Sequence, residues 1–209
     1  MKRTGTLSLM VAGFLAAVTA SGPIQAQQDP IRIGMLTVRT GPLTTGGKQM
    51  ELGLEAFLKE RGNKIAGRPV EVIYADTAAT PAIALTKTQE LVERNKVHLI
   101  IGPVAAFEAL AIDDYIRKSQ TPIISASAAA EDLTQRQANP WFIRTSATSA
   151  QPAHPLADYA ATALNYKRIA IVAEDLAFGY EAAGGFQRVF EERGGKIVQK
   201  LWTPFNTAD

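Results

Sequence analysis

The chain has 209 residues, 46% of them hydrophobic, and contains no cysteine, which excludes disulfide bonds and thiolate metal sites. Lysine and arginine number 22 against 20 acidic residues, and no long run of like charges occurs. This balance argues against nucleic acid and against an anionic membrane surface as partners. A small molecule or another protein is therefore the expected class of partner.

The first 26 residues have the layout of a secretory signal peptide. Lys2 and Arg3 precede the uncharged apolar run "TLSLMVAGFLAAVTA", and "IQA" at 24–26 offers small residues for cleavage near Ala26. The run is short for a membrane anchor, which needs about 20 apolar residues and is the weaker alternative. We therefore expect export to the periplasm. Without Lys2 and Arg3, the remaining chain has 20 basic and 20 acidic residues, so its net charge is about zero.

Short apolar runs alternate with helical patterns along the rest of the chain. The apolar runs predict strands at 31–37, 70–76, 97–102, 122–125, 141–146, 167–175 and 196–202. Thr80 followed by Pro81 indicates a helix start, and the helix continues through Leu85, Thr88, Leu91 and Val92.

Four other segments have helical spacing, and each predicts a buried face. The expected faces are Met50, Leu54, Phe57 and Leu58 in 46–62; Ala109, Ile112 and Ile116; Leu156, Tyr159, Ala160 and Ala163; and Ala182, Phe186, Val189 and Phe190.

Strands that alternate with helices predict an α/β fold with parallel sheets and helices on both faces. Ligands of such sheets bind beyond the carboxyl ends of the strands. The loops of interest all follow strands, and they read "VRTGPLTTGG", "GPVAAFEA", "SASAAAED" and "EDLAFGYE".

Two stretches of the chain resemble each other, "ERGNKIAGRPVEVIYAD" at 60–76 and "ERGGKIVQKLWTPFNTAD" at 192–209. This internal similarity fits two lobes with the same βαβ topology, although any helix–glycine–strand unit has a similar pattern. After the second copy the chain stops at Asp209, one helix and about two strands into the second lobe. We expect that lobe to be incomplete.

No arrangement of residues for catalysis or metal binding is evident. "GPLTTGGK" at 41–48 has the wrong spacing for a phosphate-binding P-loop, although the following helix start could still bind an anion. His98 lies in a core-strand pattern and is expected to be structural, and His154 lies between two prolines at a helix start. We expect a protein that is not an enzyme and has neither metal nor cofactor.

The chain resembles type I periplasmic solute-binding proteins of ABC importers, in particular the branched-chain amino acid family. The resemblance covers Ile31 to Asp209. The segments that match the family are, in chain order, "IRIGMLTVRTGPL", "GRPVE", "LIIGPV", "TPIIS", "DLTQR", "WFIRTS" and "KRIAIVAEDLAFGYE". It implies two α/β lobes, at 27–147 and 148–209, that close around a ligand and deliver it to a membrane permease. Family members are much longer, which agrees with an incomplete second lobe.

The resemblance also implies the ligand site. The family's head-group serine and threonine fall on Ala106 and Ala129, a small residue falls on Ser127, a clamp tyrosine on Phe178, and a first-loop aromatic near Gly46. The expected ligand-binding residues are Ala105, Ala106, Phe107, Ser127, Ala128, Ala129, Phe178 and Gly46. Phe107 could instead pack beneath its own helix.

These departures from the family pattern remove hydroxyl groups from the expected ligand site and enlarge it. A buried zwitterionic head group needs both donors and acceptors, and backbone N–H groups with Ser127 suit a carboxylate better than an ammonium. We expect a carboxylate on an apolar or aromatic body, such as an aromatic acid, with a branched-chain amino acid as the alternative. Residues 27–209 alone are expected to bind a ligand weakly or undetectably. A ligand-sensing domain of a receptor or regulator is the second functional hypothesis.

Overall fold

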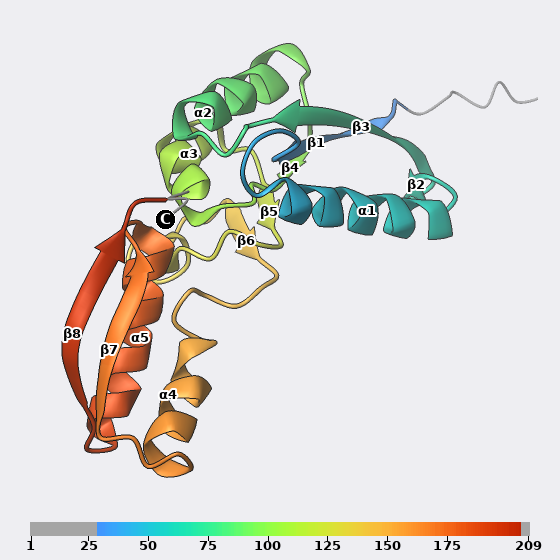
Figure 1. The fold of residues 1–209 in the computed structure, drawn as a ribbon. Coiled ribbons are helices and arrows are strands. Elements are labelled where there is room, and N and C mark those ends of the chain that lie inside the picture. The colour runs from blue at the N-terminus through green and yellow to red at the C-terminus, as the bar shows by residue number, and fades with distance from the viewer. Residues whose placement is uncertain (1–28, 206–209) are drawn as a thin grey trace, which may run out of the picture.

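The computed structural model describes residues 29–205, which form two sheets joined by a linker (Figure 1). The expected signal peptide and the cleavage near Ala26 lie outside these residues. The first sheet has six strands in the order β2-β3-β1-β4-β5-β6, and the second pairs β7 with β8. The strands are β1 (Ile31–Thr37), β2 (Lys64–Ile65), β3 (Arg68–Asp76), β4 (Leu99–Ile101), β5 (Ile123–Ser125), β6 (Phe142–Arg144), β7 (Arg168–Glu174) and β8 (Lys196–Thr203).

Helices connect successive strands, as the alternating pattern predicts. They are α1 (Thr44–Glu60), α2 (Pro81–Gln89), the π-helix η1 (Glu90–Arg94), α3 (Ala106–Ser119), the 3-10 turn η2 (Glu131–Leu133), α4 (Ala153–Thr162) and α5 (Ala177–Glu192). None of the helices in 29–205 has the length and apolar character that a membrane span requires.

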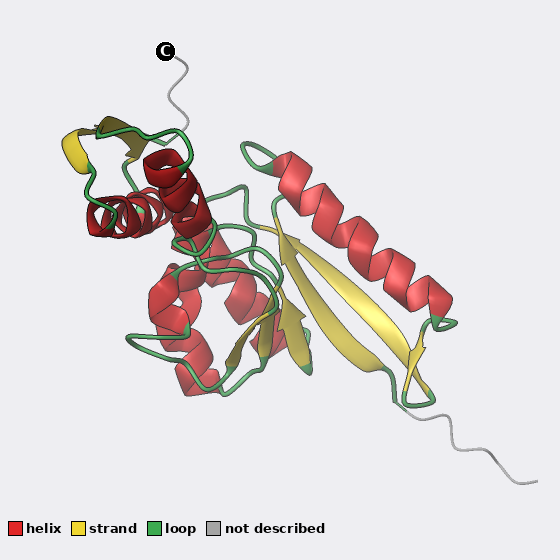
Figure 2. Ribbon diagram, turned by 90° about the horizontal axis from the view of Figure 1, so that it is seen from below, coloured by secondary structure: helices red, strands yellow, loops and turns green. Residues whose placement is uncertain are grey.

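The first sheet is parallel except at its edge. β1 lies between β3 and β4, with Ile33 paired to Val72 and to Leu99, and β4, β5 and β6 continue in parallel. Only β2 runs antiparallel, against the start of β3. In Figures 1 and 2, α1 covers one face while α2 and α3 cover the other. The expected α/β architecture with helices on both faces is therefore confirmed in this sheet.

The core of the first sheet lies beneath α2 and α3. Fully buried side chains of β1, β4 and β5 meet the predicted apolar face of α3, whose members Ala109, Ile112 and Ile116 are each 1% exposed. Burial of such side chains is worth about 1.5–3 kcal/mol each, so this core is the main source of stability in the described chain.

The second sheet has helices on one face only among the described residues. α4 and α5 lie on the same side of this sheet (Figure 1). They pack around the fully buried ring of Phe190, against Ile169 and Ile197 of the strands. The opposite face exposes Val172 and its strand partner Leu201, which are 65% and 46% exposed. Within residues 29–205, helices therefore cover both faces of the first sheet and one face of this one.

Several local predictions were wrong in whole or in part. His98 is exposed and precedes β4 and so does not lie in a core strand, but its role is structural as expected, because its Nδ1 accepts the Arg32 N–H at 3.0 Å. Phe57 is 42% exposed because the apolar stripe of α1 is narrower than its spacing suggested. In α4 the predicted Leu156 and Tyr159 point outward, and Ala163 is also exposed. Of the predicted face only Ala160 is buried, and Ala157 and Ala161 complete the buried face of this helix.

Candidate functional site

A cavity of about 230 Å³ lies at the carboxyl ends of strands from both sheets. The loops after β1, β4 and β5 form one side, and residues at or after the ends of β7 and β8 form the other. Its lining residues are Leu43, Val104, Ala105, Ala106, Phe107, Ser127, Ala129, Glu174, Leu176, Phe178 and Phe205. All four loops singled out in the sequence contribute to it.

Six of the eight predicted site residues line this cavity, and Ala128 and Gly46 do not. Ala128 is fully buried, and its N–H donates to Ser125 Oγ at 2.9 Å. Gly46 lies in the first turn of α1, where an added Cβ would meet Val104 Cγ1 at 3.4 Å. The first loop reaches the cavity through Leu43 instead, which has a left-handed backbone with φ of 68°.

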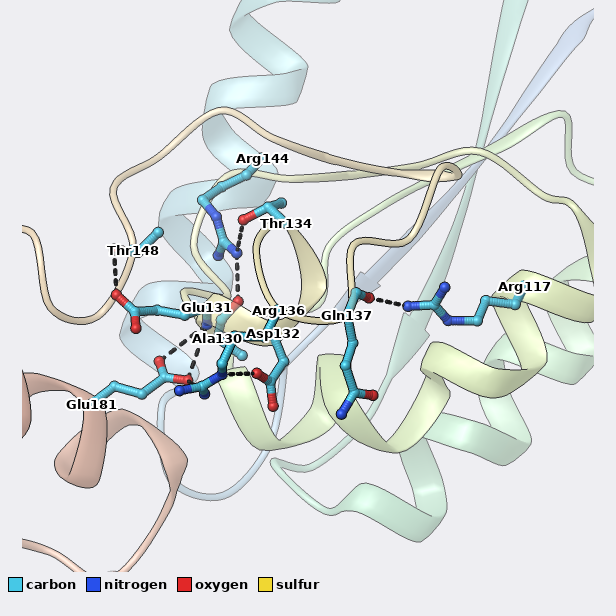
Figure 3. A network of polar contacts seen from close by, with 10 residues as sticks. All are labelled: Arg117, Ala130, Glu131, Asp132, Thr134, Arg136, Gln137, Arg144, Thr148 and Glu181. Carbon is cyan, nitrogen blue, oxygen red and sulfur yellow. Dashed lines mark hydrogen bonds and ion pairs between the residues drawn. The ribbon is translucent and has the colours of Figure 1, made fainter.

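Arg144 of β6 fixes the small-residue turn after β5. Its guanidinium donates to the carbonyls of Ala128 and Ala130 and, at 2.9 Å, to Thr134 Oγ1 (Figure 3). Carbonyl and N–H point in opposite directions across a trans peptide, so the Ala129 N–H points away from Arg144.

The pKa of Arg144 is also shifted by its surroundings. Burial lowers this pKa, and the negative charges of Glu181 and Glu131, which raise it, only partly offset the effect. The sequence did not reveal that Arg144 fixes the turn, although an arginine in the apolar run "WFIRTS" was the available signal.

Two donors on this turn remain open. Among the described residues, neither the Ser127 hydroxyl nor the Ala129 N–H has a hydrogen-bond partner. Ser127 is exposed and lines the cavity together with Ala129. An acceptor group of a ligand could therefore bind here without breaking an existing bond.

The start of α3 adds further donors to the same wall. The first N–H groups of a helix have no intrahelical partner, and the helix dipole favours an anion at this end. Ala106 and Phe107 are the first two helical residues, and both line the cavity. Gly102 lets this loop cross β1 closely, because its φ is 122° and a Cβ would lie 1.9 Å from the Leu36 carbonyl oxygen.

Glu108 holds the α3 start from beneath. Its carboxyl group is fully buried, accepts the Ala105 N–H at 3.0 Å and accepts a short hydrogen bond from the Thr77 hydroxyl. Burial raises the pKa of Glu108, although the hydrogen bonds from Thr77 and from the backbone of Ala105 and Val104 oppose this. The carboxyl group therefore positions the loop and does not face the cavity.

Asp76 fixes the first loop in a similar way. Its carboxylate accepts the N–H groups of Arg39 and Ala78 at 2.8 and 2.9 Å and the Thr40 hydroxyl at 2.6 Å. Burial alone would raise the pKa of Asp76, but these hydrogen bonds outweigh it and hold the pKa below its ordinary value.

The second-sheet wall is mostly apolar, with one carboxylate residue. Leu176, Phe178 and Phe205 line it together with Glu174 at the end of β7. The Phe205 ring also contacts Phe107, with centroids 5.4 Å apart, so the aromatic pair bridges the two sides. Phe107 packs against Val38, Ala79 and Val104 as well, so it both lines the cavity and packs beneath its helix. Glu174, Leu176, Phe205, Leu43 and Val104 were not predicted.

A larger cavity of about 620 Å³ lies on the other side of Glu131, and most of its lining residues are polar or charged. It contains Arg136, Glu181, His154 and Arg188, and the Arg188 Nη2 lies 3.2 Å from His154 Nε2. Within 29–205 no group of three or more potential metal ligands comes together.

Comparison with known proteins places this geometry in a family. The family described as periplasmic binding protein matches residues 30–209. The chain is 28% identical to Leu/Ile/Val-binding protein homolog 6 of Brucella abortus over 210 residues, which is all of this chain and 51% of that protein. It therefore spans about half the length of the curated relatives it matches.

Two solved structures show the same fold. An ABC transporter substrate-binding protein from Sphaerobacter thermophilus is 38% identical, with a TM-score of 0.78 over 87% of this chain and 49% of that one. A solute-binding protein of an ABC transporter from Rhodopseudomonas palustris, in complex with 3,4-dihydroxybenzoic acid, is 32% identical. Its TM-score is 0.79 over 85% of this chain and 48% of that one. The match to the family covers most of the sequence, and the chain belongs to the periplasmic binding protein family.

Proposed function

We propose that this chain is the ligand-recognising part of a periplasmic solute-binding protein of an ABC importer, and that its ligand is an aromatic carboxylic acid. The observation that carries the proposal is the cavity between the two sheets. One of its walls presents open hydrogen-bond donors, and the other is apolar with a single carboxylate.

The donor wall suits a carboxylate. Ser127 Oγ, the Ala129 N–H and the first N–H groups of α3 belong to residues of this wall, and no side-chain carboxylate comes from it. Hydrogen bonds to an ionised acceptor are about twice as strong as neutral ones, so these groups can offset the cost of burying the charge.

The apolar wall suits a ring. Phe107, Phe178 and Phe205 offer flat surface, and aromatic pairs gain about 0.5–1.5 kcal/mol beyond their buried area. Glu174 at this wall can accept a hydrogen bond from a ring hydroxyl on the far side from the ligand carboxylate. The Rhodopseudomonas palustris relative in complex with 3,4-dihydroxybenzoic acid supports this ligand class.

The mechanism is binding and not catalysis. A ligand that contacts both walls favours the arrangement in which they are close, and a permease would recognise that arrangement. The family supports a periplasmic location, and the neutral charge of residues 4–209 supports a small-molecule ligand.

A thermal-shift titration tests the ligand class. A ligand that binds only the folded state raises the melting temperature in proportion to the logarithm of its concentration above Kd. We expect millimolar 3,4-dihydroxybenzoate and 4-hydroxybenzoate to raise the melting temperature of the chain, whereas leucine and isoleucine leave it unchanged.

Benzylamine is the matched control, because it keeps a ring and replaces the carboxylate by an ammonium. A melting temperature that rises with leucine-like amino acids and not with aromatic acids would contradict the proposal. A rise with benzylamine as large as with the acids would show that the donor wall does not select a carboxylate.

A further inference from the structure

We propose that Glu181 is a positioning residue that sets the separation of the two walls of the cavity. It belongs to α5 on the second-sheet side and bonds to the turn that carries Ala129 on the first-sheet side. We call this set of bonds, from Glu181 to Glu131 and Arg136, the Glu181 contact.

The bonds are direct, and the Glu181 carboxylate that accepts them is largely shielded from water, whereas the Arg136 side chain is 64% exposed. The Glu131 N–H donates to Glu181 Oε1 at 3.0 Å and to Oε2 at 3.1 Å, and Arg136 Nη2 lies 3.7 Å from Oε1 (Figure 3). The Glu181 side chain is 10% exposed. Hydrogen bonds to a charged acceptor are stronger than neutral ones, and partial burial reduces their screening.

The turn that Glu181 holds is rigid on its own side. Arg144 donates a hydrogen bond to the Ala130 carbonyl. Because the N–H of the same trans peptide points the opposite way, the Glu131 N–H faces α5. The Glu131 carboxylate accepts the Thr148 hydroxyl at 3.2 Å, and Arg136 is also bonded to Asp132 (Figure 3). Because this turn is held by its own hydrogen bonds, a displacement of Glu181 moves the turn as a whole.

Both ends of the contact lie next to cavity residues. Ala129 lines the cavity two residues before Glu131, and Phe178 lines it one helical turn before Glu181. The contact therefore fixes the gap that a ligand must fill between the donor wall and the Phe178 ring. This role in ligand binding rests on the proposed function, whereas the role in wall spacing does not.

Spin-label distances across the linker test the spacing. Because the chain has no cysteine, Lys118→Cys on α3 and Gln199→Cys on β8, both exposed, can be labelled without background. We expect a narrow distance distribution in the otherwise unchanged chain. Glu181→Ala should broaden it, and the ratio of the close to the separated arrangement should fall roughly tenfold.

Glu192→Ala is the matched control, because Glu192 is an exposed glutamate at the far end of the same helix. Glu181→Gln keeps the size of the side chain and one acceptor oxygen, so the width of its distance distribution should lie between those of Glu181→Ala and Glu192→Ala. Should Glu181→Ala fail to fold by circular dichroism, Glu181→Gln decides. An unchanged distribution in the folded Glu181 variant overturns the proposal, and so does an equally broad one in the parent chain.

A calorimetric arm separates this proposal from the proposed function. Glu181→Ala should weaken 3,4-dihydroxybenzoate binding by the same factor by which it shifts the distance ratio, whereas Glu192→Ala should not. If the parent chain binds no aromatic acid, the proposed ligand is wrong, but the distance result is unaffected. Loss of affinity without any change in distance would overturn the role of Glu181 in wall spacing.

Discussion

Ser127 is the side chain of the donor wall whose role can be separated from the fold. It is exposed, its hydroxyl has no partner in the described chain, and it lines the cavity. Ser127→Ala should weaken binding of an aromatic acid about tenfold, because a hydrogen bond to a charged group is lost. Isothermal titration calorimetry measures this, and the melting temperature without ligand should not change.

Ser146→Ala is its control. Ser146 is also an exposed serine, and it follows β6, the strand next to β5, but it does not line the cavity. Equal losses of affinity in the two variants would mean that the Ser127 hydroxyl has no particular role in binding the ligand.

Glu108 predicts a pH dependence of stability. Burial raises its pKa in the folded state, while the unfolded value stays near the reference of about 4.3. The stabilising contribution is complete below about pH 4.3, because both states are then protonated. It declines as the pH rises through the raised folded pKa, because only the unfolded state has released its proton.

Glu108→Gln removes this decline. The free energy of unfolding of the variant, relative to the parent chain, should therefore rise between pH 4 and pH 8, as urea unfolding at each pH would measure. Asp114→Asn serves as control, since Asp114 is an exposed carboxylate of the same helix. A difference between Glu108→Gln and the parent chain that stays constant with pH would refute the assignment.

At the scale of elements, a single glycine sets how α5 meets β7. A Cβ on Gly179 would lie 2.0 Å from the Glu174 carbonyl oxygen, so helix and strand end could not keep their present distance. Gly179→Ala should lower the free energy of unfolding by about 1–3 kcal/mol, the usual range for overpacking. Urea unfolding monitored by circular dichroism measures the change.

Gly184 on the same helix is a matched comparison. No atom lies within 4 Å of a Cβ built there, so Gly184→Ala should stabilise the chain by about 0.5–1 kcal/mol through helix propensity. Destabilisation by both substitutions to the same extent would show that close approach is not the reason for glycine at 179.

The elements also show what the sequence could and could not predict. Apolar runs placed the main strands because burial on both faces leaves a continuous pattern. The buried face of α4 was assigned correctly at Ala160 and wrongly at Leu156 and Tyr159, because large apolar side chains are expected to be buried. The packing is close just before this helix, since a Cβ on Gly185 of α5 would lie 2.7 Å from the Cβ of Ala150, and within the helix Ala157, Ala160 and Ala161 pack around Phe190. Such close packing is a tertiary requirement that helical spacing does not show.

The cavity was predictable in part for a similar reason. The loops that contain Ala105 and Ser127 follow from the rule on parallel sheets, and the resemblance to the family singled out these residues within them. Phe205 and Glu174 depend on how the second sheet is placed against the first, which no local pattern records. Arg144 escaped notice because it acts on the site through the carbonyls that it holds, and not by facing the cavity.

At the scale of the whole molecule, the two sheets have unequal cores. Fifteen buried hydrophobic residues form the cluster of the first sheet, whereas four form that of the second, within residues 29–205. Contacts between the two sides include those of α3 with α5, the Phe107–Phe205 pair and the Glu181 contact. Regions with fewer buried contacts open at a lower free energy, so the second sheet should open without the first.

Hydrogen exchange followed by mass spectrometry measures this difference directly. Amides of β7 and β8 should exchange faster than those of β1 and β4, by about tenfold for each 1.4 kcal/mol of difference in opening free energy. An aromatic acid that binds both walls should slow exchange in β7 and α5 more than in β1, because it couples the weaker unit to the stronger one. Equal protection of the two sheets without ligand would mean that they unfold as one cooperative unit, and the few contacts between them would then be stronger than their number suggests.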